Sequence, residues 1–243
     1  MKTNYLWTLL ISVSFGLNSC SVKEAPLNTL SKSEIKQGWQ LLFDGKTTNG
    51  WRGYNKKVFP ESGWGVKDGV LFCLASDRGE AGNGGDIITE KKYSNFELKL
   101  EWKISKAGNS GVMYLATELP GEPAWHAAPE MQILDGANFP MELKPSQLSG
   151  SAYDLVAADP QTVKPYGQWN QIKIVVNNGI VEHWQNGKMV VKYTLWTPEW
   201  KEMVGKSKFH EYPEFLNMSK EGYICLQDHG GGAWFRNIKI REL

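Results

Sequence analysis

The residues best suited to proton transfer are two glutamates and a histidine in short runs of alternating character. Glu101 stands in a run of alternating charged and apolar residues, and Glu130 precedes Gln132 by two positions. Gln227 and His229 have the same spacing. Alternate strand residues point to one face, so the members of each pair are predicted to project together. A carboxylate and an imidazole that titrates near neutral pH suit general acid–base catalysis, which makes Glu101, Glu130 and His229 the candidate catalytic residues.

Each of these residues also has a structural interpretation. Glu101 would equally be a solvated strand carboxylate paired with Lys99 or Lys103. Glu130 and Gln132 would equally lie on an exposed sheet face, since polar residues of one parity are typical of such a face. The pattern alone leaves these alternatives open.

A second set of residues is predicted to bind substrate. They lie on the candidate strands or in turn-like segments beside them, where binding residues are often found. Asp135 precedes Gly136 and has a turn role as its alternative. Arg236, if buried, would need a partner such as a carboxylate. The set comprises Asn109, Trp125, His126, Gln132, Asp135, Tyr153, Asp154, Gln227 and Arg236.

The sequence assigns no metal or nucleotide site. His126, His183 and His210 are not at metal-ligand spacing from one another, and HExxH and CxxC patterns do not occur. A divalent ion such as Ca²⁺, held by carboxylates and carbonyls, is left open, and it could stabilise an enolate. No Gly-x-Gly-x-x-Gly opens a helix, so we do not expect the chain to perform its own NAD-linked oxidation.

Short strands are predicted to carry these candidates. Residues 65–72 form a hairpin around Asp68-Gly69, and the segments 180–185 and 188–195 flank the turn-forming pair Asn186-Gly187. Residues 96–104 alternate cleanly, with four apolar residues on one face. Further strands are expected at 111–117, 130–134, 169–177, 223–229 and 233–241.

Helical periodicity is scarce in the sequence. One turn is expected at residues 31–37, and a short helix from Pro198 with Thr197 as its N-cap. Many short strands in a continuous turn-rich pattern predict an all-β jelly-roll sandwich of two antiparallel sheets with short helical insertions.

The composition excludes some classes of function. The 243 residues include 27 basic and 26 acidic side chains, a formal net charge of +1. Non-specific nucleic-acid binding rests on neutralising phosphates, so a near-neutral chain is a poor candidate for it. The balance suits an uncharged carbohydrate better. Among the 11 Trp residues, Trp125, Trp196 and Trp200 lie in or beside loops and are the best candidates to line a sugar cleft.

The N-terminus is typical of a bacterial lipoprotein. Lys2 precedes an apolar run of about 13 residues, too short for a bilayer span and suited to a signal peptide. The run ends in Leu-Asn-Ser-Cys, which resembles a lipobox that is cut before an acylated Cys20. We therefore expect a signal peptide at 1–19, a tether at 20–35 and one domain at 36–243, anchored in the cell envelope.

Two cysteines remain in the predicted domain, Cys73 and Cys225. An envelope location would permit a disulfide between them. Both stand in apolar, strand-like runs, so buried free thiols are at least as consistent with the sequence.

Several phrases succeed one another along the chain, among them LFDGK at 42–46, NFEL at 95–98, GNSGV at 108–112, PEMQILD at 129–135, GQWN at 167–170 and GYICLQDHG at 222–230. Their order and spacing resemble the 3-keto-disaccharide hydrolase family over residues 36–243. The resemblance implies a concanavalin A-like sandwich and an envelope protein that cleaves glycosides whose glucose unit was first oxidised to a ketone at C3. A separate oxidoreductase would supply that ketone.

The chemistry implied by the resemblance begins with removal of the acidified C2 proton. The C1 substituent then leaves by elimination, and water adds back. On this hypothesis Glu101, Gln132 and His229 form one compact polar cluster. Two alternatives stay open: a non-catalytic carbohydrate-binding lipoprotein of the same fold, and a conventional retaining glycosidase that uses Glu101 and Glu130.

Overall fold

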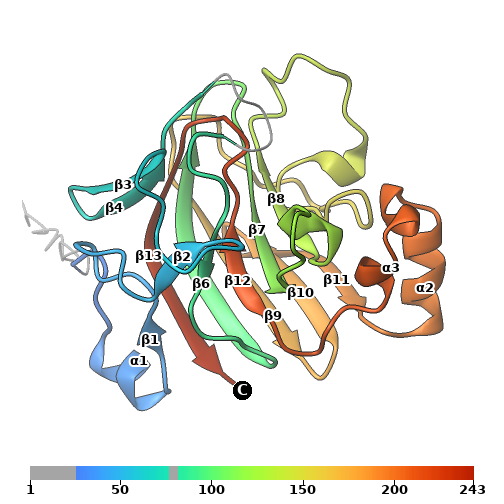
Figure 1. Ribbon diagram of the computed structural model, residues 1–243, viewed down its shortest axis with the longest axis horizontal. Coiled ribbons are helices and arrows are strands. Elements are labelled where there is room, and N and C mark those ends of the chain that lie inside the picture. The colour runs from blue at the N-terminus through green and yellow to red at the C-terminus, as the bar shows by residue number, and fades with distance from the viewer. Residues whose placement is uncertain (1–25, 77–81) are drawn as a thin grey trace, which may run out of the picture.

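The protein is a sandwich of two antiparallel β-sheets, seen in a computed structural model that describes residues 26–76 and 82–243 (Figure 1). The predicted signal peptide and Cys20 lie outside the described residues. The two sheets confirm the predicted all-β class.

The larger sheet has eight strands. In spatial order these are β11 (Lys188–Thr194), β10 (Ile180–Gln185), β9 (Asn170–Asn177), β6 (Phe96–Ile104), β13 (Ala233–Glu242), β4 (Val70–Cys73) and β3 (Trp64–Lys67), with β1 (Gln40–Leu41) paired to β13. The smaller sheet has five, in the order β2 (Trp51–Gly53), β5 (Ile87–Thr89), β12 (Tyr223–Leu226), β7 (Asn109–Ala116) and β8 (Glu130–Leu134).

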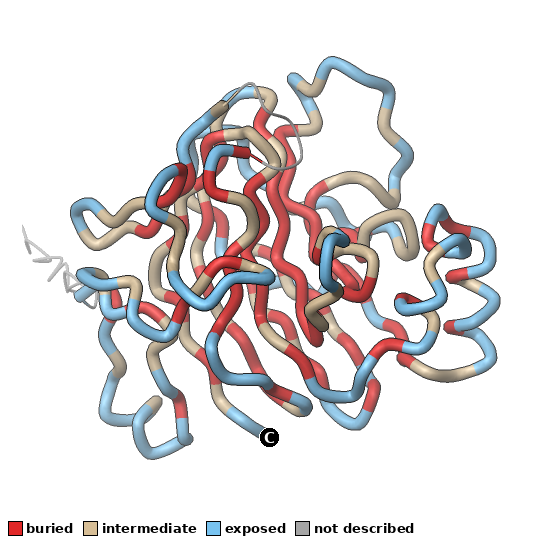
Figure 2. Tube along the Cα trace, viewed as in Figure 1, coloured by how far each residue is buried: buried red, intermediate tan, exposed pale blue. Residues whose placement is uncertain are grey.

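The core fills the space between the sheets. In β6, Leu98, Leu100, Trp102 and Ile104 are buried, while Lys99, Glu101 and Lys103 are only partly buried on the outer face, as the alternation predicted. Met131 and Ile133 of β8 belong to the same core cluster. Figure 2 shows the buried residues running along the central strands and the exposed ones in the surrounding loops.

Both predicted hairpin turns are confirmed. Asp68 and Gly69 join β3 to β4, and Asn186 and Gly187 join β10 to β11. All four residues have positive φ, between 48° and 81°, as a type I′ turn requires. The predicted strand at 223–229 is shorter than expected, because β12 ends at Leu226 and a loop follows.

Short helices surround the sandwich. They are α1 (Lys32–Lys36), α2 (Pro198–Gly205), α3 (Pro213–Leu216) and the 3₁₀ turns η2 (Ala124–His126), η3 (Pro145–Gln147) and η4 (Lys208–Glu211). Thr197 caps α2 as predicted, accepting a hydrogen bond from the Trp200 amide (3.2 Å).

The fold corrects one prediction about the tryptophans. Trp200 is fully buried, stacked between Tyr193 (ring centroids 5.6 Å apart) and Phe215 (5.7 Å). Trp196 donates its indole N–H to the Met218 carbonyl (3.3 Å). Trp200 therefore holds α2 and α3 against the sandwich and does not line a cleft.

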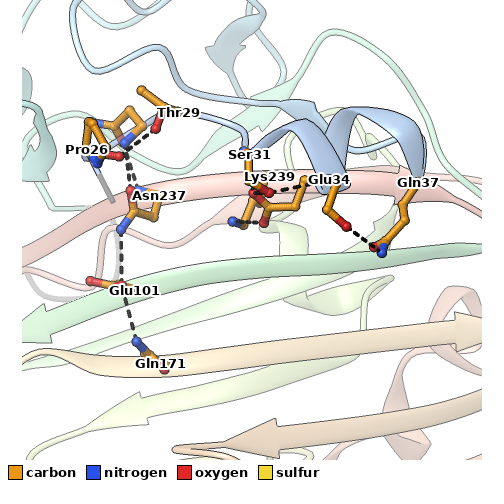
Figure 3. Close-up of polar contacts among 11 residues, drawn as sticks. Pro26, Thr29, Ser31, Glu34, Gln37, Glu101, Gln171, Asn237 and Lys239 are labelled. Carbon is orange, nitrogen blue, oxygen red and sulfur yellow. Dashed lines mark hydrogen bonds and ion pairs between the residues drawn. The ribbon is translucent and has the colours of Figure 1, made fainter. Parts of the chain in front are cut away.

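The segment that precedes β1 packs on the larger sheet. Asn28 and Asn237 of β13 exchange two hydrogen bonds between main chain and side chain, of 2.7 and 2.8 Å (Figure 3). Glu34 of α1 is ion-paired with Lys239 of β13. Part of the segment expected as a tether, from residue 26 onward, is thus held against the outer face of this sheet.

Among the described residues, the helices are too short and too polar to cross a bilayer.

Cys73 and Cys225 are buried free thiols. Burial raises the pKa of Cys73 to about 12 and that of Cys225 well above its usual value, so both thiols are protonated at neutral pH.

Candidate functional site

A small polar pocket lies on the outer face of the smaller sheet. It contains seven of the predicted site residues and one that was not predicted. Its walls are formed by Asn109, Trp125, Glu130, Gln132, Tyr153, Lys208, Gln227 and His229. These residues come from β7, β8, the 3₁₀ turns η2 and η4, and the loops that follow β8 and β12, so distant parts of the sequence meet here.

Strand β8 supplies Glu130 and Gln132. Both point away from the sandwich core because Met131 and Ile133, of opposite parity, are buried within it. Glu130 and Gln132 are nonetheless only 6% and 3% exposed, since loops cover this face. The prediction that Glu130 and Gln132 share one strand face is confirmed. The alternative, that this face is exposed to solvent, is wrong.

Glycine at position 111 makes room for the Glu130 carboxylate. Gly111 of β7 lies opposite Gln132, and Met113 opposite Glu130. A Cβ atom on Gly111 would lie 1.9 Å from Glu130 Oε1, far inside contact distance. The neighbouring strand thus shapes the cavity in which this carboxylate sits.

Three side-chain amides accompany the carboxylate. Gln132 Oε1 accepts a hydrogen bond from the Ile133 amide (2.9 Å), which fixes the orientation of its side chain. Asn109 Oδ1 is buried, and no donor among the described residues bonds to it. A buried amide oxygen without a donor is suited to accept a bond from a ligand hydroxyl.

The loop after β12 presents His229. Its neighbour Asp228 is fully buried, and its carboxylate accepts the amides of Gly84 (3.0 Å) and Gly230 (3.2 Å). Burial raises the pKa of Asp228, while these backbone bonds act to lower it. The main-chain N–H of Gln227 donates a hydrogen bond to the Gly111 carbonyl of β7 (3.0 Å). These contacts fix the main chain on both sides of His229.

Aromatic and cationic side chains form the outer wall. Lys208 Nζ lies 4.1 Å from the Trp125 ring centroid and 4.6 Å from that of Tyr153. The Asp154 carboxylate accepts a hydrogen bond from the Lys208 main-chain N–H (2.9 Å) and so helps to position Lys208. Asp154 itself does not line the pocket. Sequence reasoning missed Lys208, because no pattern marks a lysine at the start of a 3₁₀ turn.

The inner pocket is small and adjoins a wider cleft. Its free volume is about 30 Å³, room for a water molecule or two. Asn109 and His229 also line a neighbouring cleft of about 270 Å³, which extends past residues 105–108 and Phe139. Entry of a sugar ring therefore requires the side chains of the outer wall to move.

The structure does not bring Glu101 or Arg236 to this pocket. Glu101 lies on the outer face of the larger sheet, where Oε2 pairs with Arg236 (2.7 Å). Its Oε1 accepts hydrogen bonds from Asn237 (3.1 Å) and Gln171 (3.4 Å) (Figure 3). The core separates it from Gln132 and His229. The expected cluster of these three residues is therefore wrong in respect of Glu101, because β6 and β8 belong to different sheets.

Two other predicted residues lie beside the pocket without lining it. The Asp135 carboxylate accepts hydrogen bonds from the Ala107 main-chain N–H (2.9 Å) and from the Asn138 side-chain amide. These bonds correspond to the turn role that the sequence offered as the alternative for Asp135. His126 Nδ1 lies 3.0 Å from a Glu122 carboxylate oxygen, and its ring is stacked on Tyr212 with ring centroids 3.9 Å apart. Within the described ranges, no three His, Cys, Asp or Glu side chains gather in a way that could hold a metal ion.

The sequence matches one protein family along most of its length. The profile of the 3-keto-alpha-glucoside-1,2-lyase-like domain matches residues 38–241. The chain is 42% identical to a 3-keto-disaccharide hydrolase of Bacteroides thetaiotaomicron, over 96% of this chain and 87% of that protein.

Solved structures agree with this result. A predicted glycosyl hydrolase of Parabacteroides distasonis superposes with a TM-score of 0.82 at 33% identity, covering 90% of this chain and all of that one. A second predicted glycosyl hydrolase of the same organism gives a TM-score of 0.61 at 29% identity, over 80% of this chain and all of that one.

Proposed function

This chain belongs to the 3-keto-α-glucoside-1,2-lyase-like family, and we propose that it hydrolyses the glycosidic bond of 3-keto-glucosides and 3-keto-disaccharides. The observation that carries the proposal to specific residues is the pocket on the smaller sheet. It joins a carboxylate, an imidazole and three amides in one polar site, in which the carboxylate and two of the amides are buried.

The ketone determines which bond can break. A carbonyl at C3 acidifies the proton on C2, and a base that removes this proton leaves an enolate. Expulsion of the C1 oxygen, with a proton from an acid, gives an enone and releases the second sugar. Water then adds at C1, so the net reaction consumes one water and yields 3-ketoglucose and an alcohol. Such a route needs a base, an acid and donors toward the enolate oxygen.

The positions of the two titratable groups support a division of labour. Glu130 lines only the inner pocket, where a carboxylate can accept a proton, so it takes the C2 proton. His229 lines both the inner pocket and the wider cleft, so it protonates the oxygen that leaves into that cleft. The amides of Gln132 and Gln227 face the oxidised ring and donate to its ketone oxygen as charge develops there.

A conventional retaining mechanism is disfavoured by position. It requires two carboxyl groups about 5–5.5 Å apart. Glu101 and Glu130 lie on the outer faces of different sheets, with the core between them. A purely binding role is disfavoured by the family and by the burial of a carboxylate and amides in the same pocket.

Paired substrates test the activity. We expect the protein to cleave 3-keto-trehalose and to leave trehalose intact under the same conditions, with and without a divalent metal ion. Cleavage of neither sugar would contradict the proposal.

Matched variants test the assignment of residues. Glu130→Gln and His229→Ala should each lower the rate by at least about 10²-fold. Glu101→Gln is the matched control, since it changes the same group on the opposite face and should keep most of the activity. Full activity in both pocket variants would show that the site lies elsewhere.

The cellular setting is part of the proposal. We propose an envelope lipoprotein, acylated at Cys20, that receives its ketone-bearing substrate from a separate oxidoreductase. The lipobox-like Leu-Asn-Ser-Cys at 17–20 supports the anchor. Radiolabelled palmitate should label the wild-type protein, and Cys20→Ser should abolish labelling and release the protein from the membrane fraction. Labelling of the Cys20→Ser variant would contradict the anchor.

A further inference from the structure

A second concave surface lies on the opposite side of the sandwich from the catalytic pocket. It is a groove of about 400 Å³ on the outer face of the larger sheet, across β10, β9, β6 and β13. This volume is within the range of sites that hold small molecules. Its charged and polar lining includes Lys99, Glu101, Gln171, Lys173 and Lys239, with Trp184 at one side.

Positive charge is in excess around this groove. Lys173 and Arg241 share Glu97, Arg236 pairs with Glu101, and Lys239 pairs with Glu34. Glu182, which accepts the Trp184 indole N–H, pairs with Lys192. With Lys99, the surface has six cationic side chains and four carboxylates, an excess of two positive charges.

Lys99 is the cation that no carboxylate of the described residues pairs with. Its ammonium lies 4.4 Å from the centroid of the buried Trp39 ring. Burial lowers the pKa of Lys99. The Glu97 carboxylate acts to raise this pKa, and the positive charges of Lys173, Lys239 and Arg241 act to lower it. An anion beside Lys99 would therefore be favoured by the surrounding field.

The floor of the groove is fixed in place before any ligand binds. Glu101 is held by Arg236 and, as Figure 3 shows, by Asn237 and Gln171, and all three come from neighbouring strands. Leu100 and Ile172 reach the groove through their main chain, because their side chains belong to the core. The exposed side chain of Gln171 remains for ligand hydroxyls to meet. The Trp184 indole beside it donates its N–H to Glu182 (3.0 Å), and Lys173 Nζ lies 4.0 Å from its ring centroid.

We propose that this groove binds a saccharide that carries a carboxylate or sulfate group, with the anionic group beside Lys99 and the sugar ring toward Trp184 and Gln171. The excess of positive charge selects an anion. An indole and an amide suit the C–H faces and hydroxyls of a sugar. The groove is thus distinct in position and charge preference from the catalytic pocket.

Such a site would hold the protein on an acidic glycan while the opposite face acts on a neutral substrate. The proposal does not depend on the catalytic function, because no residue of the groove lines the catalytic pocket. The two can therefore fail separately.

NMR titration tests this proposal with three probes: D-glucuronate, methyl β-D-glucoside and inorganic sulfate. We expect glucuronate to bind the wild-type protein more tightly than either of the other probes, and its binding to weaken as salt is added. Lys99→Gln should weaken it by about tenfold or more. Lys173→Gln provides a second groove variant if Lys99→Gln does not fold.

Two controls separate this site from other causes. Lys201→Gln removes an exposed lysine on α2 and should leave glucuronate binding unchanged, as should the pocket variant Glu130→Gln. Equal binding of methyl glucoside, equal binding of sulfate, no binding of glucuronate, or undiminished binding in folded groove variants would each overturn the proposal. Glucuronate binding that is lost in Glu130→Gln would also overturn it, since the ligand would then lie in the catalytic pocket.

Discussion

Alanine at position 111 would disturb the polar pocket on the smaller sheet while preserving the fold. Gly111 does not adopt a positive φ, so its backbone conformation tolerates a side chain. The added Cβ would lie 1.9 Å from Glu130 Oε1, 2.5 Å from its Cδ and 2.8 Å from its Cγ. These atoms all belong to one side chain, so Glu130 is the group that must move.

The size of the effect follows from that distance. To reach an ordinary contact of 3.4 Å, the carboxylate oxygen must retreat by about 1.5 Å. A misplacement of about 1 Å can cost 10²-fold in rate, so Gly111→Ala should lower kcat/KM by at least about 10²-fold. The free energy of unfolding should stay within about 1 kcal/mol of wild type, because alanine restricts the unfolded chain and compensates part of the strain.

The assay combines kinetics on 3-keto-trehalose with thermal unfolding of the same preparations. Gly205→Ala, in α2, is the matched control, because a Cβ there meets nothing within 4 Å. It should keep full activity. Wild-type activity in Gly111→Ala would refute the role given to the position of Glu130, and a large loss of stability would show that the backbone, and not the carboxylate, had moved.

Three further predictions concern the core and the pocket wall. Burial lowers the pKa of His183 from 6.5 to about 4, so the folded protein keeps it neutral while the unfolded chain binds a proton below pH 6.5. The free energy of unfolding therefore keeps the full contribution of His183 above pH 6.5 and should fall by about 2 kcal/mol at pH 5. Denaturant titrations at several pH values should find a smaller fall in His183→Gln. Trp200→Ala should lower the free energy of unfolding by about 3–5 kcal/mol, measured by the same titrations, because it removes a fully buried indole. Asp154→Ala frees the amide of Lys208 and should raise KM for 3-keto-trehalose more than it lowers kcat; unchanged kinetics would contradict the positioning role of Asp154.

Local chemistry made much of the fold predictable from the sequence. Alternation in 96–104 identified the buried face of β6, and Asp68-Gly69 and Asn186-Gly187 identified two hairpins, because these features depend on near neighbours. The loop after Leu226 was mistaken for strand, since two of the hydrogen bonds that hold Asp228, to Gly84 and Asp86, come from residues more than 140 positions away. Trp200 was misplaced for a similar reason: its burial depends on how α2 packs against β11 and α3.

The candidate site was predictable in part for the same reason. Glu130 and Gln132 share a strand, so their common face follows from parity. The separation of Glu101 from them depends on which sheet each strand joins, and that is a long-range property the alternation does not encode. Lys208 enters through the packing of η4 beside Trp125 and Tyr153, which no short pattern in the sequence indicates.

The most direct test of the account is the rate of glycosidic cleavage of 3-keto-trehalose beside trehalose by the wild-type protein and by Glu130→Gln. The account predicts cleavage of the oxidised sugar alone, and a loss of at least about 10²-fold in the variant. Equal cleavage of both sugars, or undiminished cleavage of 3-keto-trehalose by Glu130→Gln, would contradict it.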